Sequence, residues 1–431
     1  MSGVASTYRR LLRREVVDIC LFIFIADIVT GIPIPVFPLY ATSLGASLGL
    51  LGLITATLGL GRLVGALPVG MLSDRLDRKS VLVAGMVVFA VAFAIYAVVP
   101  NAEWMIVPRF LQAIAMVATF PLGVAYIGDV VEERDRGAAI GVYTAAMGAG
   151  FAVGPLIGSS FAASSGYPAA YVVGAAVAVA GAVYGVVRLV RKRPQAAEGA
   201  IGRRLIDVRA LRALAREPRM LMACVANIAM TLSMTGAIFT YFPVYARGVG
   251  ISTVTIGALF AWRSLASAAG RIPVGAVASR IPASWTLAGV LILEAAVDIG
   301  IARTHSSLAL GALLIVEGVL FGIFLVSGQA AVAAASGPDN RGAAVGMFWM
   351  AGSVGDMVGP IALGMVAQAF GLIAVFDGVA GGVAVGAGLV LWLGLLSVAE
   401  DPRKNRAVDV AAGDDAHHAA VASDPLQAGR H

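Results

Sequence analysis

The chain has 431 residues, of which 59% are hydrophobic and only 13% are charged. A soluble domain typically carries about 25% charged residues, so this composition excludes an ordinary water-soluble protein. The formal net charge is +6, and its meaning depends on where the basic residues fall.

Twelve apolar runs follow one another along the chain, each long enough to cross a bilayer as a helix. A transmembrane helix needs about 20 mostly apolar residues, and the runs are far too long for barrel strands. We therefore predict an all-α membrane protein with twelve transmembrane helices, at roughly 17–39, 48–69, 80–100, 104–128, 138–161, 168–190, 220–242, 253–275, 284–302, 306–332, 343–366 and 372–397.

The basic residues fall on one side of this predicted topology. With the N-terminus inside, 25 of the 31 Lys and Arg lie in inner segments, two lie in outer loops and four lie within spans. Cytoplasmic loops carry such an excess. We expect an integral multi-pass plasma (bacterial inner) membrane protein with both termini cytoplasmic, whose positive charge faces membrane lipids and not nucleic acid.

Polar segments divide the chain into five parts. We predict a cytoplasmic N-tail (1–16), a six-helix half (17–190), a cytoplasmic linker (191–219), a second six-helix half (220–398) and a disordered cytoplasmic tail (399–431). The linker is the longest polar interruption, and the tail has no apolar periodicity.

The two halves repeat each other at a constant shift of 205 residues. FPLYATSLGAS (37–47) returns as FPVYARGVGIS (242–252), and 14 of 39 positions are identical between 37–75 and 242–280. RGAAIG (136–141) returns as RGAAVG (341–346) at the same shift. Because each half has an even number of spans, the copies are parallel and related by an axis along the membrane normal. Such halves can rock about a site at the midplane, which gives alternating access.

The segment GMLSDRLDRK (70–79) lies on the inner side between the second and third spans. It resembles the loop signature of the major facilitator superfamily, Gly-x-x-x-Asp-Arg-x-Gly-Arg-Arg/Lys. With the repeat and the twelve spans, the resemblance covers everything but the tails. The matching residues are Gly70, Asp74, Arg75, Arg78 and Lys79, and Asp77 replaces the second glycine.

The resemblance implies a cytoplasmic gate motif. Arg78 would pair with Asp129, and Asp74 would lie near the positive end of a neighbouring helix, so that the inner face is latched in the outward-open state. The Asp77 departure would loosen this latch. The alternative is that these residues are only part of the usual excess of Lys and Arg in cytoplasmic loops.

The second half has partial counterparts of these motifs. It keeps Arg280 but has Ser279 where Asp74 would be. The second-half positions that we single out are Gly275, Arg280, Gly355, Asp356, Gly359 and Pro360.

The fifth span contains GVYTAAMGAGFAVGPLIGS (141–159). Glycines at four-residue spacing let another helix approach closely, and a proline bends the helix. The pattern resembles the family's antiporter motif, which favours proton-exchanging exporters; the alternative is ordinary tight packing. Its residues are Gly141, Gly150, Gly154, Pro155 and Gly158, with Ser159 in the last place.

The fourth span contains RFLQA (109–113), which resembles the family's Arg-x-x-Gln-Gly. A charge within the hydrocarbon is costly and is functional by default. Arg109, with Gln112, would assist proton coupling. The alternative is that Arg109 reaches the outer surface.

Other ionisable residues also lie within spans. In the family fold the first, fourth, seventh and tenth spans line a central cavity, which favours Asp27 and Glu317, with Arg109, as the proton or substrate site. Asp27 could instead form a structural pair with Arg62 at similar depth. Asn227 of the seventh span, with Thr231 and Ser233, offers polar contacts to a substrate.

For three further residues, Arg263, Glu294 and Asp298, a structural pairing is the favoured interpretation. Arg271 is expected to reach the inner surface. Asp356 precedes the Gly359–Pro360 kink and serves either the interface of the second half or the substrate.

These features predict a secondary transporter, most similar to drug/proton antiporters, that exports a small molecule in exchange for protons. The alternative is a proton symporter for a sugar or organic acid, and a non-transporting receptor is a third hypothesis. No span contains a histidine and no GxxxxGK[ST] loop occurs, so we expect neither an enzyme nor a catalytic site. We expect no cofactor, no metal and no nucleic-acid partner, and a monomer in contact with lipid.

Overall fold

The computed structural model describes residues 13–191, 212–277, 281–337 and 340–399, and the described chain is helical throughout. The predicted linker and tail lie mostly outside the described residues. The first half contains α2 (Arg14–Gly31), α3 (Pro33–Ser43), α4 (Leu48–Arg75), α5 (Arg78–Val98), η1 (Glu103–Met105), α6 (Ile106–Val130), α7 (Glu133–Ser165) and α8 (Tyr167–Arg188). The second half contains α10 (Pro218–Thr231), η3 (Leu232–Phe239), α11 (Phe242–Gly248), α12 (Thr253–Val277), α13 (Ala283–Arg303), α14 (Ser307–Ala334), α15 (Arg341–Phe370) and α16 (Leu372–Ala399).

Eleven helices of the described chain are long and apolar enough to cross a membrane. Two of these spans are composite: α2 and α3 form the first, and α10, the π-helical segment η3 and α11 form the seventh. The remaining predicted span, the eighth (253–275), is α12, which has 25 residues and is therefore long enough, although Arg263 and Arg271 reduce its apolarity.

The 205-residue shift is visible in the backbone. Four glycines have positive φ, and they form two pairs at that shift: Gly45 and Gly250 (φ 87° and 91°), and Gly166 and Gly371 (φ 86° and 87°). Each lies in a turn after a helix, where a residue without Cβ adopts this conformation at little cost. The repeat therefore extends to the turn conformation, and at Gly166 and Gly371 it reaches a turn outside the segments compared in the sequence.

Helix contacts within the halves follow the same shift. In the first half the glycines of α2 and α7 meet, because a Cβ on Gly154 would lie 2.6 Å from the Cα of Gly31. In the second half Gly359 of α15 meets Gly236 of η3, with a corresponding distance of 3.5 Å. The two halves are thus built on one pattern of close backbone contact.

The halves pack against each other along two seams, α4 with α15 and α7 with α12. A Cβ on Gly52 would collide with the carbonyl oxygen of Pro360, and a Cβ on Gly257 would lie 2.6 Å from the carbonyl oxygen of Pro155. These contacts exchange under the shift, since 52 corresponds to 257 and 155 to 360. Such an exchange is the property of a two-fold interface.

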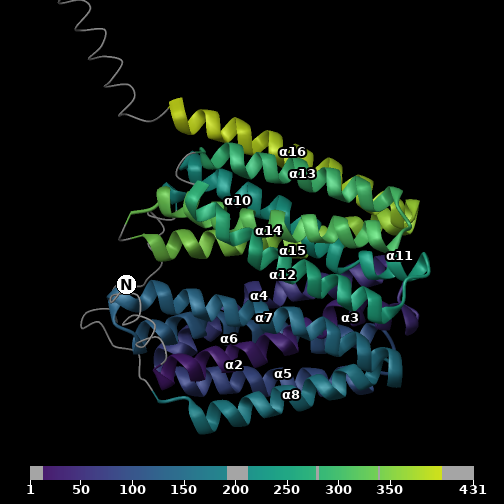
Figure 1. Ribbon diagram of the computed structural model, residues 1–431, viewed down its shortest axis with the longest axis horizontal. Helices are drawn as coiled ribbons and strands as arrows, with labels where there is room; N and C mark the ends of the chain where they lie inside the picture. The colour runs from purple at the N-terminus through teal and green to yellow at the C-terminus, as the bar shows by residue number, and fades with distance from the viewer. Residues whose placement is uncertain (1–12, 192–211, 278–280, 338–339, 400–431) are drawn as a thin grey trace, which may run out of the picture.

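The seams are closed at one end of the bundle. At the end away from the basic loops, Tyr241 Oη donates to the carbonyl oxygens of Leu48 and Pro360, each at 3.1 Å. This end, which we call the far end, also holds α3 and α11 (Figure 1). At the basic end an added Cβ would meet no atom within 4 Å at several glycines: Gly70, Gly137, Gly141, Gly342 and Gly346. The conformation is therefore closed at the far end and loosely packed at the basic end.

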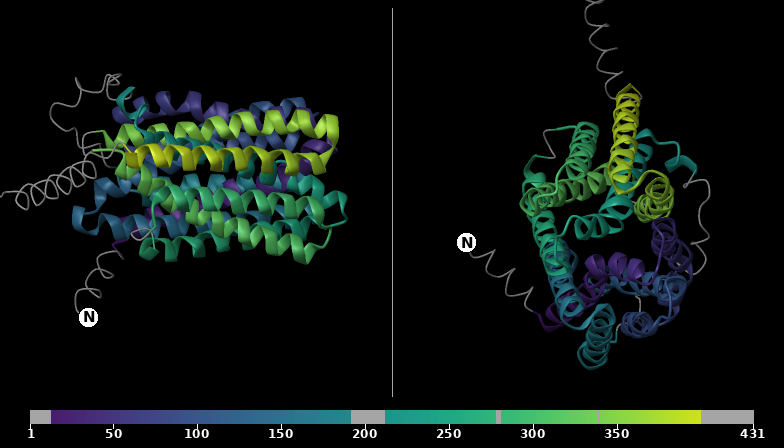
Figure 2. Two further views of the ribbon diagram at one scale, coloured as in Figure 1. Left: turned by 90° about the horizontal axis from the view of Figure 1, so that it is seen from above. Right: turned by 90° about the vertical axis from the view of Figure 1, so that its right-hand side faces the viewer.

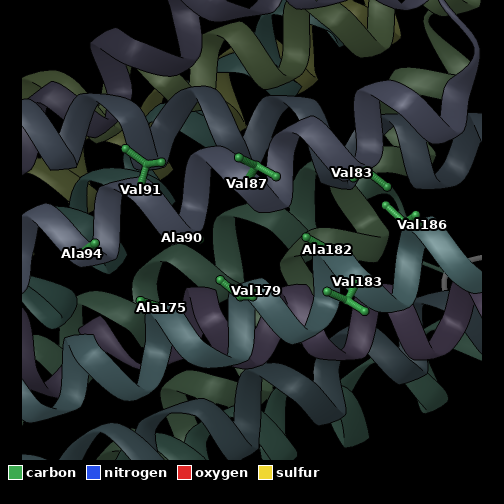
Figure 3. Close-up of a pocket in the computed structure, with 10 residues that line it drawn as sticks. All are labelled: Val83, Val87, Ala90, Val91, Ala94, Ala175, Val179, Ala182, Val183 and Val186. Carbon is green, nitrogen blue, oxygen red and sulfur yellow. The ribbon is translucent and has the colours of Figure 1, made fainter.

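A shallow groove of about 610 Å³ runs along the first half between α5 and α8 (Figure 3). Its lining has no polar side chain that could orient a solute, so the groove offers only apolar contact. It is lined by Val83, Val87, Ala90, Val91, Ala94, Ala175, Val179, Ala182, Val183 and Val186.

The seam contacts predict that Gly52→Leu prevents closure of the far end. Overpacking costs about 1–3 kcal/mol, which should reduce the closed population about 5- to 150-fold. Spin labels at Asn101 and Ser307, which are exposed at the far ends of the two halves, should report a longer distance.

Gly141→Leu is the matched control, because a Cβ at Gly141 meets nothing within 4 Å. An unchanged label distance in Gly52→Leu would show that the seam does not close as described.

Candidate functional site

Asp27 lies on α2 with only 4% of its surface exposed. The structure describes no hydrogen-bond partner for its Oδ2 atom. A Cβ on Gly150 of α7 would lie 3.0 Å from the Cβ of Asp27, so the antiporter-like motif packs directly on this carboxyl. Arg271 of α12, in the opposite half, is a cation that acts on it electrostatically. Asp27 therefore faces the boundary between the halves.

Arg62 bonds to Asp356 and not to Asp27. Its Nη2 donates to Asp356 Oδ2 at 2.6 Å, and the hydroxyl of Thr235 donates to Asp356 Oδ1 at 2.5 Å. The structure thus corrects the alternative of an Asp27–Arg62 pair. It also places Asp356 at the interface of the second half, bonded to α4 of the first half.

Arg109 is buried in an aromatic cluster of the first half. It is 8% exposed, and its guanidinium carbon lies 4.0 Å from the ring centroid of Phe37. Its Nη1 donates to Gln112 Oε1 at 3.3 Å, and Tyr96 Oη donates to the same oxygen at 3.4 Å. Arg109 does not reach the surface, so that alternative is wrong.

Glu317 is paired with Arg263 inside the second half. Arg263 Nη2 donates to Glu317 Oε1 at 2.5 Å, and the two side chains are 2% and 0% exposed. The expected pairing of Arg263 with Glu294 and Asp298 is therefore wrong. Those two carboxyls instead surround Ser233, whose Oγ lies 2.9 Å from Glu294 Oε1 and 3.0 Å from Asp298 Oδ2.

Asn227 is engaged by the neighbouring helix. Its Nδ2 donates to the carbonyl oxygen of Phe348 at 2.7 Å, and Thr231 Oγ1 donates to Asn227 O at 2.8 Å. Its amide thus fixes α10 against α15, and one of its two N–H donors is already used in this conformation.

The gate motif forms the predicted ion pair. Arg78 Nε lies 3.3 Å from Asp129 Oδ2, and Arg78 Nη1 donates to Ser73 Oγ at 3.2 Å. Lys79 Nζ donates to the carbonyl oxygen of Val186 at 2.6 Å, while Arg75 is exposed and ends α4. Gly70 has free space around it, and the side chain of Asp74 lies outside what the structure describes.

Asp77 has a role that sequence reasoning missed. It is the N-cap of α5, with Oδ1 accepting from the Ser80 amide at 3.0 Å and Oδ2 accepting from the Ser80 hydroxyl at 2.7 Å. Burial opposes ionisation, but these bonds from Ser80 hold the pKa of Asp77 below its usual value. An aspartate followed by Ser three residues later is a recognisable capping signal.

The antiporter-like motif supplies close contacts on both sides of α7. Gly150, Gly154 and Gly158 approach the backbone of α2 between Phe24 and Ile32. Pro155 and Ser159 approach Gly257 of α12 across the seam, whereas Gly141 makes no such contact.

The second-half counterparts of the antiporter-like motif make some of the same close contacts. Gly355 approaches Ile228 and Thr231, and Gly359 approaches Leu232, while Pro360 contacts Gly52 across the seam. Gly275 lies in α12, and Arg280 lies outside the described residues. Arg271 is only partly exposed, and the structure describes no hydrogen-bond partner for its buried Nε atom.

Long apolar helices in two repeats, with ionisable side chains buried inside, define an integral multi-pass membrane protein of the transporter class. The chain belongs to the Major Facilitator Superfamily, whose sequence profile matches residues 19–261 and 246–425. It is accordingly a secondary transporter, as the motifs predicted.

Similar proteins extend this comparison. An uncharacterized MFS-type transporter of Methanocaldococcus jannaschii is 22% identical over 84% of this chain and 93% of its own length. Multidrug resistance protein 2 of Bacillus subtilis is 27% identical over 37% of this chain and 40% of its own. The quinolone resistance protein NorA of Staphylococcus aureus is 29% identical over 32% and 36%. The matches to both resistance proteins thus span less than half of either chain.

Solved structures share the fold. A bacterial homolog of the human lysosomal transporter Spinster, in an inward-facing and occupied conformation, matches with a TM-score of 0.70 over 89% of this chain and 94% of its own at 16% identity. The nucleoside transporter NupG matches with a TM-score of 0.70 over 89% and 98% at 17% identity. At these identities the likeness shows the architecture alone.

Glu317→Gln is expected to destabilise the protein, because it leaves the charge of Arg263 buried without its carboxylate. Breaking such a buried pair typically costs about 3–5 kcal/mol. Thermal unfolding of the purified protein should shift to markedly lower temperature. The double variant Glu317→Gln/Arg263→Gln should recover most of the loss, and a single variant as stable as the parent would contradict the pairing.

Proposed function

We propose that this transporter exports small organic molecules across the plasma membrane in exchange for protons. Both termini are cytoplasmic in this proposal, so the basic end faces the cytoplasm and the described conformation is open inward. The partial similarity to two drug resistance proteins supports a drug or a drug-like metabolite as the cargo.

The observation that carries the proposal is the environment of Asp27. An ionised carboxylate without a partner is costly in an apolar bundle, and a bound proton removes that cost. Asp27 lies against Gly150 and across the seam from Arg271. A cargo that binds there therefore meets a site whose charge depends on whether the proton is present.

Arg109 and Glu317 complete the proposed machinery. Arg109 adds a buried positive charge to the first half, and in this proposal it assists the coupling. Glu317 can take a proton only by giving up Arg263. We therefore assign the primary proton site to Asp27 and a supporting role to Glu317.

Asp27→Asn should abolish proton-driven export while the protein still inserts in the membrane, because the amide cannot exchange a proton. The measurement is efflux of a panel of fluorescent drugs from cells that carry each variant, with and without a protonophore. Asp377→Asn, at an exposed pair with Arg303, is the matched control. Full proton-driven export in Asp27→Asn would defeat the assignment.

The same assay distinguishes the symport alternative. An exporter should extrude the drugs only while a proton gradient is present. A symporter should instead accumulate its solute faster when the outside is acidified. Uptake of that kind, with no efflux, would replace the proposed direction of transport.

Asp74→Ala should reduce turnover by removing the proposed latch of the outward-open state. The Arg78–Asp129 pair should remain, since its two side chains bond to each other directly. Initial efflux rates at matched expression should fall, and an unaltered rate would remove Asp74 from the latch.

A further inference from the structure

Two carboxyls of α13 compete for one hydroxyl of the seventh span. Ser233 Oγ lies 2.9 Å from Glu294 Oε1, and 3.2 Å and 3.0 Å from the two oxygens of Asp298. A serine hydroxyl has one hydrogen to donate. If both carboxyls were ionised, at least one would face the lone pairs of Ser233 with no proton between them.

The surroundings do not supply the missing positive charge. Glu294 and Asp298 are both 0% exposed, and the structure describes no partner for Glu294 Oε2. The charged groups that act on Glu294 from neighbouring helices are Glu317 of α14 and Arg263 of α12, which already bond to each other.

The remaining helices packed on α13 add little positive charge near Glu294 and Asp298. α16 contributes Asp377, which pairs with Arg303 at the far end. α10 contributes one charged residue, Arg219, which lies in its first turn, at the end of the helix away from η3. Two carboxylates that share such a site cannot both stay ionised at low cost. The geometry therefore requires a proton on the pair.

Ser233 belongs to the π-helical segment η3, and another residue of this segment bonds to the ion pair that joins the two halves, Arg62–Asp356. Two residues further on, Thr235 donates to Asp356 Oδ1 at 2.5 Å, and Asp356 Oδ2 accepts from Arg62 of the first half at 2.6 Å. Single π turns in helices occur frequently at functional sites. One short segment thus touches the carboxyl pair on one side and the link between the halves on the other.

We propose that Glu294 and Asp298 together bind one proton in this inward-open conformation, and that η3 transmits the occupancy of this site to the Arg62–Asp356 bridge. This deepens the proposed proton-coupled function but uses a site distinct from Asp27. On loading, an O–H bond forms on one carboxyl, which donates to Ser233 while Ser233 donates to the other carboxylate.

Loss of the proton leaves two carboxylates around one hydroxyl. Their repulsion moves Ser233 and with it Thr235, which shares the same π-helical segment. Asp356 then loses its second donor, the bridge to Arg62 weakens, and the α4–α15 seam opens at the far end. Protonation therefore favours the inward-open state. An exporter driven by inward proton flow needs this, because a proton taken up from outside must return the protein to the state that releases it inside.

Infrared difference spectroscopy of the purified protein in lipid tests the proton directly. The protonated carboxyl C=O band of the parent should lose intensity in both Glu294→Gln and Asp298→Asn, since in each variant the remaining carboxylate accepts from Ser233 alone. Asp377→Asn should leave that band unchanged. Equal band intensity in the parent and both pair variants would overturn the site.

Spin-label distances between Asn101 and Ser307 test the transmission. Raising the pH should lengthen the distance in the parent, and Glu294→Gln should hold it short at every pH. Thr235→Val should retain the infrared band but lose the pH response. The matched control is Thr55→Val, because Thr55 is equally buried in α4 and bonds only to Leu51 O in its own helix. A pH response that survives in Thr235→Val would overturn the role of η3.

These outcomes separate this inference from the proposed function. If Asp27→Asn abolishes proton-driven export and the pair shows no carboxyl band, the inference fails alone. If the band and the pH response are present but no proton-driven export occurs in any variant, the proposed function fails and the switch in η3 stands.

Discussion

An ionised side chain inside an apolar helix bundle is stable only beside an opposite charge, and this constraint organises the interior of the protein. Two arginines meet it with carboxylates: Arg62 with Asp356 across the halves and Arg263 with Glu317 within one half. Arg109 meets it in part with the face of Phe37, since an aromatic ring attracts a cation. The carboxyls that lack such a partner, Asp27 and the Glu294–Asp298 pair, are the groups for which a proton is the remaining solution.

The repeat explains how the helices are placed, and the sequence was sufficient to predict it. Glycines that recur at a shift of 205 residues recur because each half needs the same close contacts, such as Gly31 with Gly154 and Gly236 with Gly359. A run of about 20 apolar residues has few alternatives to a membrane helix. The twelve helices, their parallel halves and the Arg78–Asp129 pair were therefore predictable, the last through family resemblance.

The partners of the buried charges were not predictable in the same way. The sequence gives the depth of a residue in the membrane, but it does not give the rotation of its helix or the helix that lies opposite. Arg62 could have reached Asp27 or Asp356, which lie at similar depth. It bonds to Asp356 because α4 packs against α15. The π-helical turn at η3 also changes which side Ser233 and Thr235 face. Neither hydrophobic periodicity nor a sequence motif predicts this turn.

The two seams share a backbone plan but differ in charge, and this asymmetry gives them different parts in the conformational change. Gly52–Pro360 and Gly257–Pro155 are equivalent contacts. At the equivalents of Arg62 and Asp356, however, the second seam has Ser267 and Phe151. Phe151 instead packs on Phe239 of η3, with ring centroids 6.3 Å apart.

An apolar contact of this kind does not depend on protonation, whereas the Arg62–Asp356 bridge changes with the charge around it. The α4–α15 seam can therefore respond to a proton through this bridge, whereas the Phe151–Phe239 contact cannot. Because η3 touches both seams through Phe239 and Thr235, a shift of this one segment reaches both of them.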